Sequence, residues 1–302
     1  MAAMRRSNPL MLVALALIWG ASFMFIKIAD RELAPATLIL GRLGSAALLL
    51  AAIALVSLGA RETARELRAA WRWLVVVGLV NTAVPFWLLS WGETRIDSGL
   101  ASIIQGAVPI FNALIAFGFF REMRVTGWRL AGLGIGFVGV ALLVGAQPEG
   151  RLLGAIAVVG MALCYAIGSL LAGRHLRGTA PLVVALASCA VSTVAALPAG
   201  VAQAPHHVWH AKTIASILVL GLVGTALAYL LFFALIRSAG APYATLVTYL
   251  VPPIALAYGA LFLDERFGLA AFAALALVLA GVALGTGAWR PVRLRRSLPA
   301  ET

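Results

Sequence analysis

Three polar side chains lie inside long apolar stretches of this sequence, where they could bind a solute. Arg42 lies about 7 residues from one end of an apolar block, or roughly 10 Å deep at 1.5 Å per residue of helix. Gln105 lies at a similar depth in another block, and Asn81 falls in the middle of a third. Polar groups surrounded by lipid must face the protein interior or a water-filled cavity, so we expect these residues to line a binding site. The alternatives are an Arg42 that extends to the headgroups and amides that only tie helices together.

Aromatic residues with polar tips form a second group of candidates. They are Trp19, Tyr165, Tyr229 and Tyr249. Each lies in an apolar block, where an aromatic side chain either packs between helices or contributes to a substrate site. We expect all four to belong to the substrate site, with simple packing as the alternative.

Three prolines interrupt the same apolar blocks. They are Pro85, Pro109 and Pro252. Proline lacks a backbone N–H and clashes with the preceding turn, so it kinks a helix. We expect these positions to act as hinges or to shape a vestibule, and a purely structural bend is the alternative.

The apolar blocks themselves predict an all-α polytopic membrane protein. The 302 residues are 63% hydrophobic and 11% charged, with a mean hydropathy of +1.01. Ten blocks are long enough to cross a hydrocarbon core of about 30 Å. They are residues 10–29, 35–59, 71–90, 98–119, 126–146, 152–173, 181–200, 213–236, 241–263 and 268–288. The segment Arg61–Arg72 between the second and third blocks is expected to be a charged loop.

The chain contains an internal repeat. The stretch Gly78–Glu122 recurs without a gap at Gly221–Glu265, which places Pro109 on Pro252. Each half holds five spans, an odd number, so the second half enters the membrane upside down. Two inverted five-helix repeats are a transporter architecture with the substrate site near the midplane. The predicted units are residues 1–147 and 148–290, followed by a basic tail at 291–302.

The net charge of +12 is distributed as an orientation signal. If the amino terminus is cytoplasmic, 16 basic residues lie inside and 6 outside, with Arg42 left within a span. This split predicts a multi-pass protein of the cell (inner) membrane with both termini in the cytoplasm. The basic residues contact anionic lipid and do not form a nucleic-acid surface.

Several chemistries lack the residues they need. No carboxylate falls at midspan, so Glu93 and Asp97 near the outer mouth are the remaining candidates for proton coupling. Three histidines between 206 and 210 have metal-like spacing but no acidic or cysteine neighbour, so we expect no metal site. Phosphate-binding and nucleophile motifs are missing too, which argues against a cofactor or an enzyme.

The sequence resembles the EamA-like branch of the drug/metabolite transporter superfamily. The similar features are Trp19-Gly20 with Phe23, Pro35 with Arg42, the Pro109 helix ending in Arg121-Glu122, and Gly139–Gly145. The second half repeats the later ones with Pro252, Asp264-Glu265 and Gly281–Leu284. The resemblance implies secondary transport by alternating access, with export or exchange of amino acids, other metabolites or drugs.

Two alternatives stay open at this point. One is a membrane-embedded enzyme acting on lipid-like ligands, and the other is a non-transporting membrane subunit. The glycine runs Gly132-x-x-x-Gly136 and Gly281-x-x-x-Gly285 predict close helix packing, within one protomer or between the two protomers of a homodimer.

Overall fold

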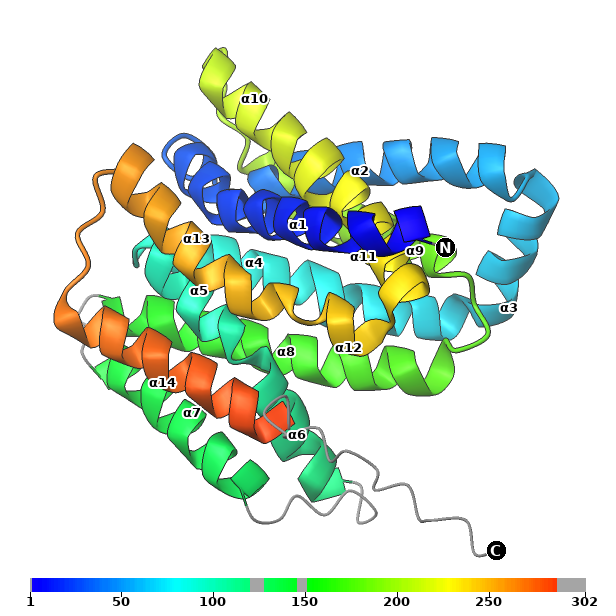
Figure 1. Ribbon diagram of the computed structural model, residues 1–302. Coiled ribbons are helices and arrows are strands. Elements are labelled where there is room, and N and C mark those ends of the chain that lie inside the picture. Colours follow the sequence, from blue (N-terminus) through cyan, green and yellow to red (C-terminus); the bar gives the residue numbers. More distant parts are fainter. Residues whose placement is uncertain (1, 120–127, 146–150, 287–302) are drawn as a thin grey trace, which may run out of the picture.

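The computed structural model describes residues 2–119, 128–145 and 151–286, and these residues form a bundle of helices (Figure 1). The pair Arg121-Glu122, the junction between the two predicted units at 147–148 and the basic tail at 291–302 lie outside the described residues. We call the end of the bundle that the basic residues predict to face outward the outer end. It lies on the left in Figure 1, opposite the amino terminus.

Six of the membrane spans are single helices. They are α1 (Ala2–Ala29), α2 (Pro35–Ser57), α7 (Trp128–Gly145), α8 (Leu152–His175), α9 (Pro181–Ala202) and α14 (Leu269–Thr286). Pro35 and Pro181 each occupy the first turn of their helix, where a missing N–H is tolerated.

Four further spans are built from two or three pieces. The third consists of α3 (Ala60–Gly78), the π-helix η1 (Leu79–Ala83) and α4 (Val84–Glu93), and the fourth of α5 (Ser98–Gly106) and α6 (Val108–Phe119). The eighth consists of α10 (Ala211–Leu218), the π-helix η3 (Val219–Leu227) and α11 (Ala228–Ala239), and the ninth of α12 (Ala241–Ala244) and α13 (Val247–Phe262). In the described residues, seven helices are long and apolar enough to cross a membrane, and three are shorter apolar helices. The predicted fold class is confirmed.

The segment Arg61–Arg72 is not the loop that its charge predicted. It is the first part of α3, which begins at Ala60 and continues into the third span without a break. Its charged residues alternate with apolar ones at helical spacing, so one face is apolar while Arg65 and Glu62 form an exposed i, i+3 ion pair at 2.5 Å. The charge of this segment therefore did not reveal its conformation.

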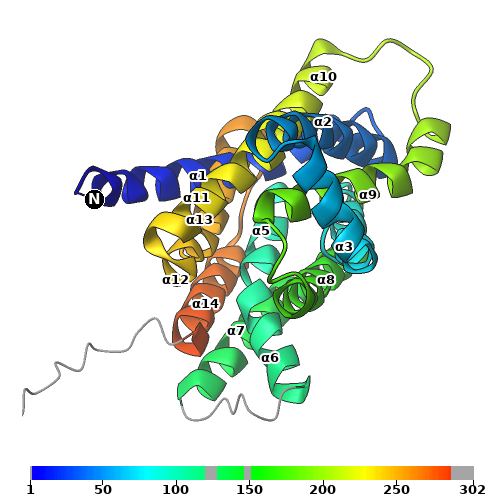
Figure 2. The same ribbon diagram turned by 90° about the vertical axis from the view of Figure 1, so that its right-hand side faces the viewer.

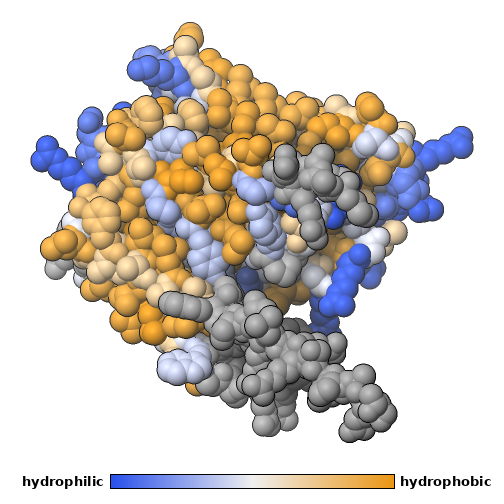
Figure 3. Space-filling view, in the orientation of Figure 1, coloured by the Kyte–Doolittle hydropathy of each residue, from blue (hydrophilic) through white to orange (hydrophobic). Residues whose placement is uncertain are grey.

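The outside of the bundle is apolar. Leu48 and Val56 on α2 are 75% and 89% exposed, and Leu269 at the start of α14 is 88% exposed. Figure 3 shows a mostly hydrophobic surface along the bundle, with hydrophilic residues gathered toward its two ends. Such a surface would aggregate in water and is suited to lipid.

The two halves of the chain pack around shared helix pairs. Helices α2 and α9, which are equivalent in the repeat, pack against each other, as do α7 and α14. The latter pair lies together at the bottom of Figure 2. There the two predicted glycine runs meet within one protomer, because a Cβ on Gly281 would lie 2.4 Å from the Cα of Gly136.

The two π-helices occupy equivalent positions of the repeat. Adding the repeat offset to η1 places it inside η3, so both halves depart from regular α-helix at the same depth. In the first half Pro85 follows η1 at once and cannot donate to the ladder. In the second half the equivalent residue is Ala228, and there the Thr225 hydroxyl donates to the Leu220 carbonyl at 2.8 Å. π-Helical turns are often found at functional sites.

Candidate functional site

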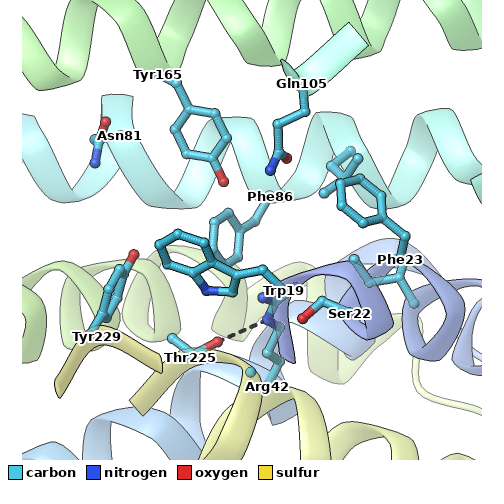
Figure 4. Close-up of a pocket in the computed structure, with 13 residues that line it drawn as sticks. Trp19, Ser22, Phe23, Arg42, Asn81, Phe86, Gln105, Tyr165, Thr225 and Tyr229 are labelled. Carbon is cyan, nitrogen blue, oxygen red and sulfur yellow. Dashed lines mark hydrogen bonds between the residues drawn. The ribbon is translucent and has the colours of Figure 1, made fainter. Parts of the chain in front are cut away.

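A cavity of about 210 Å³ lies in the middle of the bundle (Figure 4). Helices from both halves contribute to it, and both π-helices reach its wall. The lining residues are Trp19, Ser22, Phe23, Ile26, Arg42, Asn81, Phe86, Leu89, Gln105, Tyr165, Gly224, Thr225 and Tyr229. Arg42 is the one formally charged residue in this lining, and the others are aromatic, aliphatic or neutral polar.

Arg42 is held at the cavity wall by contacts from both halves. It is only 6% exposed, and its Nε donates to Oγ1 of Thr225 at 3.1 Å. The guanidinium carbon lies 4.4 Å from the centre of the Phe86 ring, a cation–π contact. Within the described residues Nε is the one guanidinium nitrogen that donates a hydrogen bond, so the two terminal nitrogens are left for a ligand.

Each π-helix makes a close contact with one residue of a neighbouring helix, Ser22 for η3 and Gly168 for η1, and the two contacts are pseudo-symmetric. Asn81 in η1 corresponds to Gly224 in η3, and both line the cavity. A Cβ on Gly224 would lie 2.9 Å from the Ser22 hydroxyl, and a Cβ on Gly168 would lie 2.5 Å from the Asn81 Cβ. Each contact therefore pairs a glycine with a polar side chain. In one contact the π-helix η3 supplies the glycine, Gly224, and in the other the π-helix η1 supplies the polar residue, Asn81.

Six of the seven residues predicted for the substrate site line this cavity. They are Trp19, Arg42, Asn81, Gln105, Tyr165 and Tyr229. Figure 4 shows Tyr165 and Gln105 facing Arg42 and Thr225 across the space. Tyr249 lies on α13, half-buried against the core, and is not part of the lining.

A second cavity of about 140 Å³ adjoins the first and shares Trp19, Gln105 and Tyr165 with it. Pro252 lines this smaller cavity, and α13 runs from Val247 to Phe262 without a break at this proline. Pro109 lies in the first turn of α6, directly after the break at Ala107, and Pro85 lies at the start of α4.

The sequence did not predict Thr225, Phe86, Phe23 or Ser22 as residues of the substrate site. The repeat held a signal for the first two. Thr225 corresponds to Thr82, and Phe86 corresponds to Tyr229, which was already a candidate. Phe23 was noted only as part of the family resemblance, and Ser22 looks like an ordinary residue of an apolar helix until the packing of α1 is known.

A second space, which we call the outer vestibule, lies at the outer end and measures about 360 Å³. It is lined by Lys27, Arg31, Asp97, Arg151, Leu263, Asp264, Glu265 and Arg266. Asp97 forms an ion pair with Arg151 at 3.2 Å. The vestibule is thus charged, whereas the central cavity carries a single cation.

At the outer end, Glu32 in the turn after α1 contacts the loop before α10, which contains the three histidines. Its carboxylate accepts hydrogen bonds from the Thr213 hydroxyl and the His210 backbone N–H, and it lies 2.9 Å from His207 Nε2. These partners, the Thr213 hydroxyl first, lower the pKa of Glu32 to about 2. Among the described residues no group of three metal-ligating side chains is present.

Comparison with known proteins agrees with this architecture. The model of the EamA-like transporter family matches residues 7–145 and 152–286. A probable terminal-alkyne amino-acid exporter from Streptantibioticus cattleyicolor is 30% identical over 283 residues, which cover 90% of this chain and 91% of that protein. The uncharacterized transporter YvbV from Bacillus subtilis is 26% identical over 282 residues, 92% of this chain and 90% of that protein.

A solved crystal structure has the same fold. It superposes with a TM-score of 0.68 at 17% sequence identity and covers 95% of this chain and 100% of its own. Two family matches, one on each half, also agree with the duplication read from the sequence. The chain belongs to the EamA-like transporter family, and it is a multi-pass membrane transporter.

Proposed function

We propose that this transporter exports small amino acids with an apolar side chain, and that the central cavity is their binding site. The observation that carries the proposal is the buried Arg42, whose terminal nitrogens are free of hydrogen bonds within the described residues and border an otherwise uncharged cavity. An unpaired arginine at the centre of a span costs about 2.5–3.5 kcal/mol on insertion scales, so we expect Arg42 to have a function that offsets this cost.

The substrate carboxylate is assigned to Arg42. A guanidinium binds a carboxylate through two parallel N–H···O bonds, which a lysine ammonium cannot reproduce. Thr225 accepts from Nε and Phe86 packs on the guanidinium, so both fix its plane before the substrate arrives. A preorganised guanidinium loses little side-chain entropy on binding.

The apolar side chain of the substrate is assigned to the aromatic and aliphatic wall. Phe23, Ile26 and Leu89 offer no hydrogen bond, so a charged or strongly polar side chain would be desolvated there without compensation. A volume of about 210 Å³ is below the roughly 300–1,000 Å³ of drug-sized sites, which favours a small metabolite over a drug.

The substrate ammonium is assigned to the side of the cavity that bears Tyr165 and Gln105. None of the described residues that line the cavity is a carboxylate, and an ammonium there would be stabilised by aromatic faces and by an amide oxygen. This recognition is weaker than an ion pair, and weak recognition suits a carrier that must release its cargo. The relative named as a terminal-alkyne amino-acid exporter supports the same substrate class. Transport in this scheme consists of binding and release, without a covalent step.

Counterflow in proteoliposomes tests the proposal. Vesicles preloaded with unlabelled L-norvaline should exchange it for radiolabelled L-norvaline or L-propargylglycine, a saturated and a terminal-alkyne amino acid of equal chain length. The matching amines, which lack the carboxylate, should not compete. Arg42→Leu should abolish exchange at normal membrane abundance, and Arg42→Lys should reduce it.

Arg65→Leu is the matched control, because Arg65 is exposed on α3. It should leave exchange unchanged. Equal competition by amines and amino acids, or normal exchange by a well-expressed Arg42→Leu protein, would contradict carboxylate recognition by Arg42.

The direction of insertion is part of the same proposal. The charge distribution supports cytoplasmic termini, and alternating access then exposes the cavity to each side in turn. In a chain without Cys164 and Cys189, a cysteine at His206 should react with an impermeant thiol reagent from outside, and one at Arg61 should not. The reverse pattern would refute this orientation.

A further inference from the structure

Two carboxyl groups are enclosed just beyond the outer end of the central cavity. Glu93 is the last residue of α4, and its side chain has no exposed surface. Asp30 follows α1 and accepts a hydrogen bond on Oδ1 from the Ser90 hydroxyl at 2.7 Å. Ser90 lies one turn before Glu93 on the same face of α4, so the two carboxyl groups face the same space between α1 and α4.

Three of the four carboxyl oxygens lack a partner. Both oxygens of Glu93 and Oδ2 of Asp30 are buried and accept no hydrogen bond from any described residue. Burying an ionised carboxylate without hydrogen bonds is far more costly than burying the neutral acid. Two such groups facing each other raise that cost further, because like charges repel in a medium of low dielectric constant.

Lys27 supplies one positive charge beside the pair. Its ammonium donates to the backbone carbonyl of Glu93 and, at 2.7 Å, to that of Ile96, so it neutralises the region without occupying the carboxyl oxygens. The charged groups that act on Glu93 are Asp30 and Lys27 on the α1 side, Arg42 on α2, and Glu265 after α13. Lys27, Asp30 and Glu93 together are electrically neutral when the two carboxyl groups hold one proton between them.

The pair lies between the two spaces that a transporter must connect. Ile26 and Leu89 line the central cavity, and Asp30 and Glu93 follow them by one helical turn, about 6 Å toward the outer end. On the other side, Lys27 lines the outer vestibule while it binds the Glu93 carbonyl. A proton on the pair is therefore adjacent to the outer vestibule and to the helices that hold the substrate.

We propose that Asp30 and Glu93 form a proton-binding site, separate from the substrate cavity, that couples proton entry to amino-acid export. This proposal rests on the transport function proposed above. Burial also raises the pKa of Asp30 to about 8, against opposing effects of Ser90 and Lys27, so the site exchanges its proton near neutral pH. The proton binds from the outer vestibule, stays on a carboxyl oxygen during the conformational change, and leaves toward the inner side as substrate moves outward.

The transport test separates coupling from transport. In proteoliposomes, Glu93→Gln and Asp30→Asn should keep L-norvaline counterflow within about twofold of wild type, because the neutral amide mimics the protonated acid. Both variants should lose accumulation driven by a pH gradient. Glu62→Gln is the matched control, since Glu62 is a carboxylate on α3 that is paired with the exposed Arg65 and lines neither space, and it should keep both activities.

The outcomes distinguish the two proposals. No counterflow by the wild-type protein with any probe refutes the proposed function. Counterflow together with unchanged gradient-driven accumulation in Glu93→Gln refutes the proton site, and so does accumulation by the wild type that follows a sodium gradient instead of a pH gradient.

A measurement without substrate tests the proton-binding site even if a variant transports poorly. Infrared difference spectra of the purified full chain, recorded between acidic and alkaline pH, should contain the carbonyl band of a protonated carboxyl group that titrates near neutral pH. The band should disappear or shift in Glu93→Gln and in Asp30→Asn, and it should remain in Glu62→Gln. A spectrum without such a band in the wild type overturns the inference.

Discussion

The carboxylate of Glu265 is bound at the amino end of α5, where Ser98 begins the helix. The Ser98 backbone N–H donates to Oε1 at 2.7 Å, while the Ser98 hydroxyl and the Gly99 N–H donate to Oε2 at 3.0 and 3.2 Å. Asp97 stands at the N-cap position but makes no capping hydrogen bond with its side chain. Glu265 therefore acts as the cap from the other half of the chain, favoured by the helix dipole, and it joins the two halves at the outer end, where it lines the vestibule.

We predict that Glu265→Ala opens the outer end. Hydrogen bonds to a charged group contribute about 1.5–3 kcal/mol each, and every 1.4 kcal/mol changes a population about tenfold. A cysteine at Leu89, which lines the central cavity, should therefore react roughly tenfold faster with an impermeant thiol reagent added outside. Glu62→Ala, which removes an exposed carboxylate of α3, is the control. Equal reactivity in the two variants would show that Glu265 does not hold the outer end closed.

We predict that Thr225→Val weakens substrate binding without preventing folding. Valine keeps the shape but removes the oxygen that accepts from Arg42 Nε, so the guanidinium loses one of the contacts that orient it. A hydrogen bond of about 0.5–1.5 kcal/mol corresponds to a two- to tenfold rise in the half-saturating L-norvaline concentration. Thr193→Val, which removes only a hydroxyl bonded within α9, should not change it. A shift confined to the maximal rate would assign Thr225 to conformational change and not to binding.

Much of the fold could be predicted because lipid imposes few solutions on a chain. A span of about twenty apolar residues must be a helix, and the duplicated stretch with its in-register prolines then determines how the halves correspond. The segment at Arg61–Arg72 was misjudged because its composition does not determine its conformation. Charged residues there are compatible with a loop or with an amphipathic helix, and contacts with the rest of the bundle decide between them.

The candidate site was less accessible to sequence reasoning. Arg42 and Asn81 could be identified because a polar side chain within a membrane span is costly to bury and often has a function. Asp30 could not be identified in this way, since a carboxylate at the end of a span is ordinarily exposed. Its enclosure depends on Ser90, sixty residues away in the chain. The π-helices share the pattern Leu-Val-x-Thr-Ala, at 79–83 and 222–226, but this pattern does not distinguish a π-helix from an α-helix, and Pro85 follows one π-helix and Ala228 the other.

We predict that Gly281→Ala lowers the thermal stability of the protein in detergent. A Cβ there would lie 2.4 Å from the backbone of Gly136, so α7 and α14 would have to separate. Gly134→Ala is the matched control, because its Cβ would meet nothing within 4 Å. Alanine is favoured over glycine in a helix by roughly 0.5–1 kcal/mol, so the control should be as stable as the wild type or slightly more so. A loss of stability in both variants would exclude close packing as the cause.

The enclosed Asp30 leads to a prediction about stability and pH. Its pKa is about 8 in the folded protein and 3.8 in an unfolded chain, because burial disfavours the carboxylate. Between these values the folded state binds more protons than the unfolded state, so this group lowers the free energy of unfolding as pH rises from about 4 to about 8. Below about pH 4 Asp30 does not change the free energy of unfolding, and above about pH 8 it lowers that free energy by a constant amount.

Asp30→Asn should remove this dependence, because asparagine keeps an oxygen for the Ser90 hydroxyl but has no proton to lose. The melting temperature of the wild type relative to Asp30→Asn should therefore fall steadily from about pH 5 to about pH 8 and then level off. Glu62→Gln, which changes a carboxylate on the surface of α3, is the control variant for this comparison. A difference between wild type and Asp30→Asn that is the same at every pH would mean that Asp30 does not change protonation in this range, and it would remove the basis for assigning the proton to this pair.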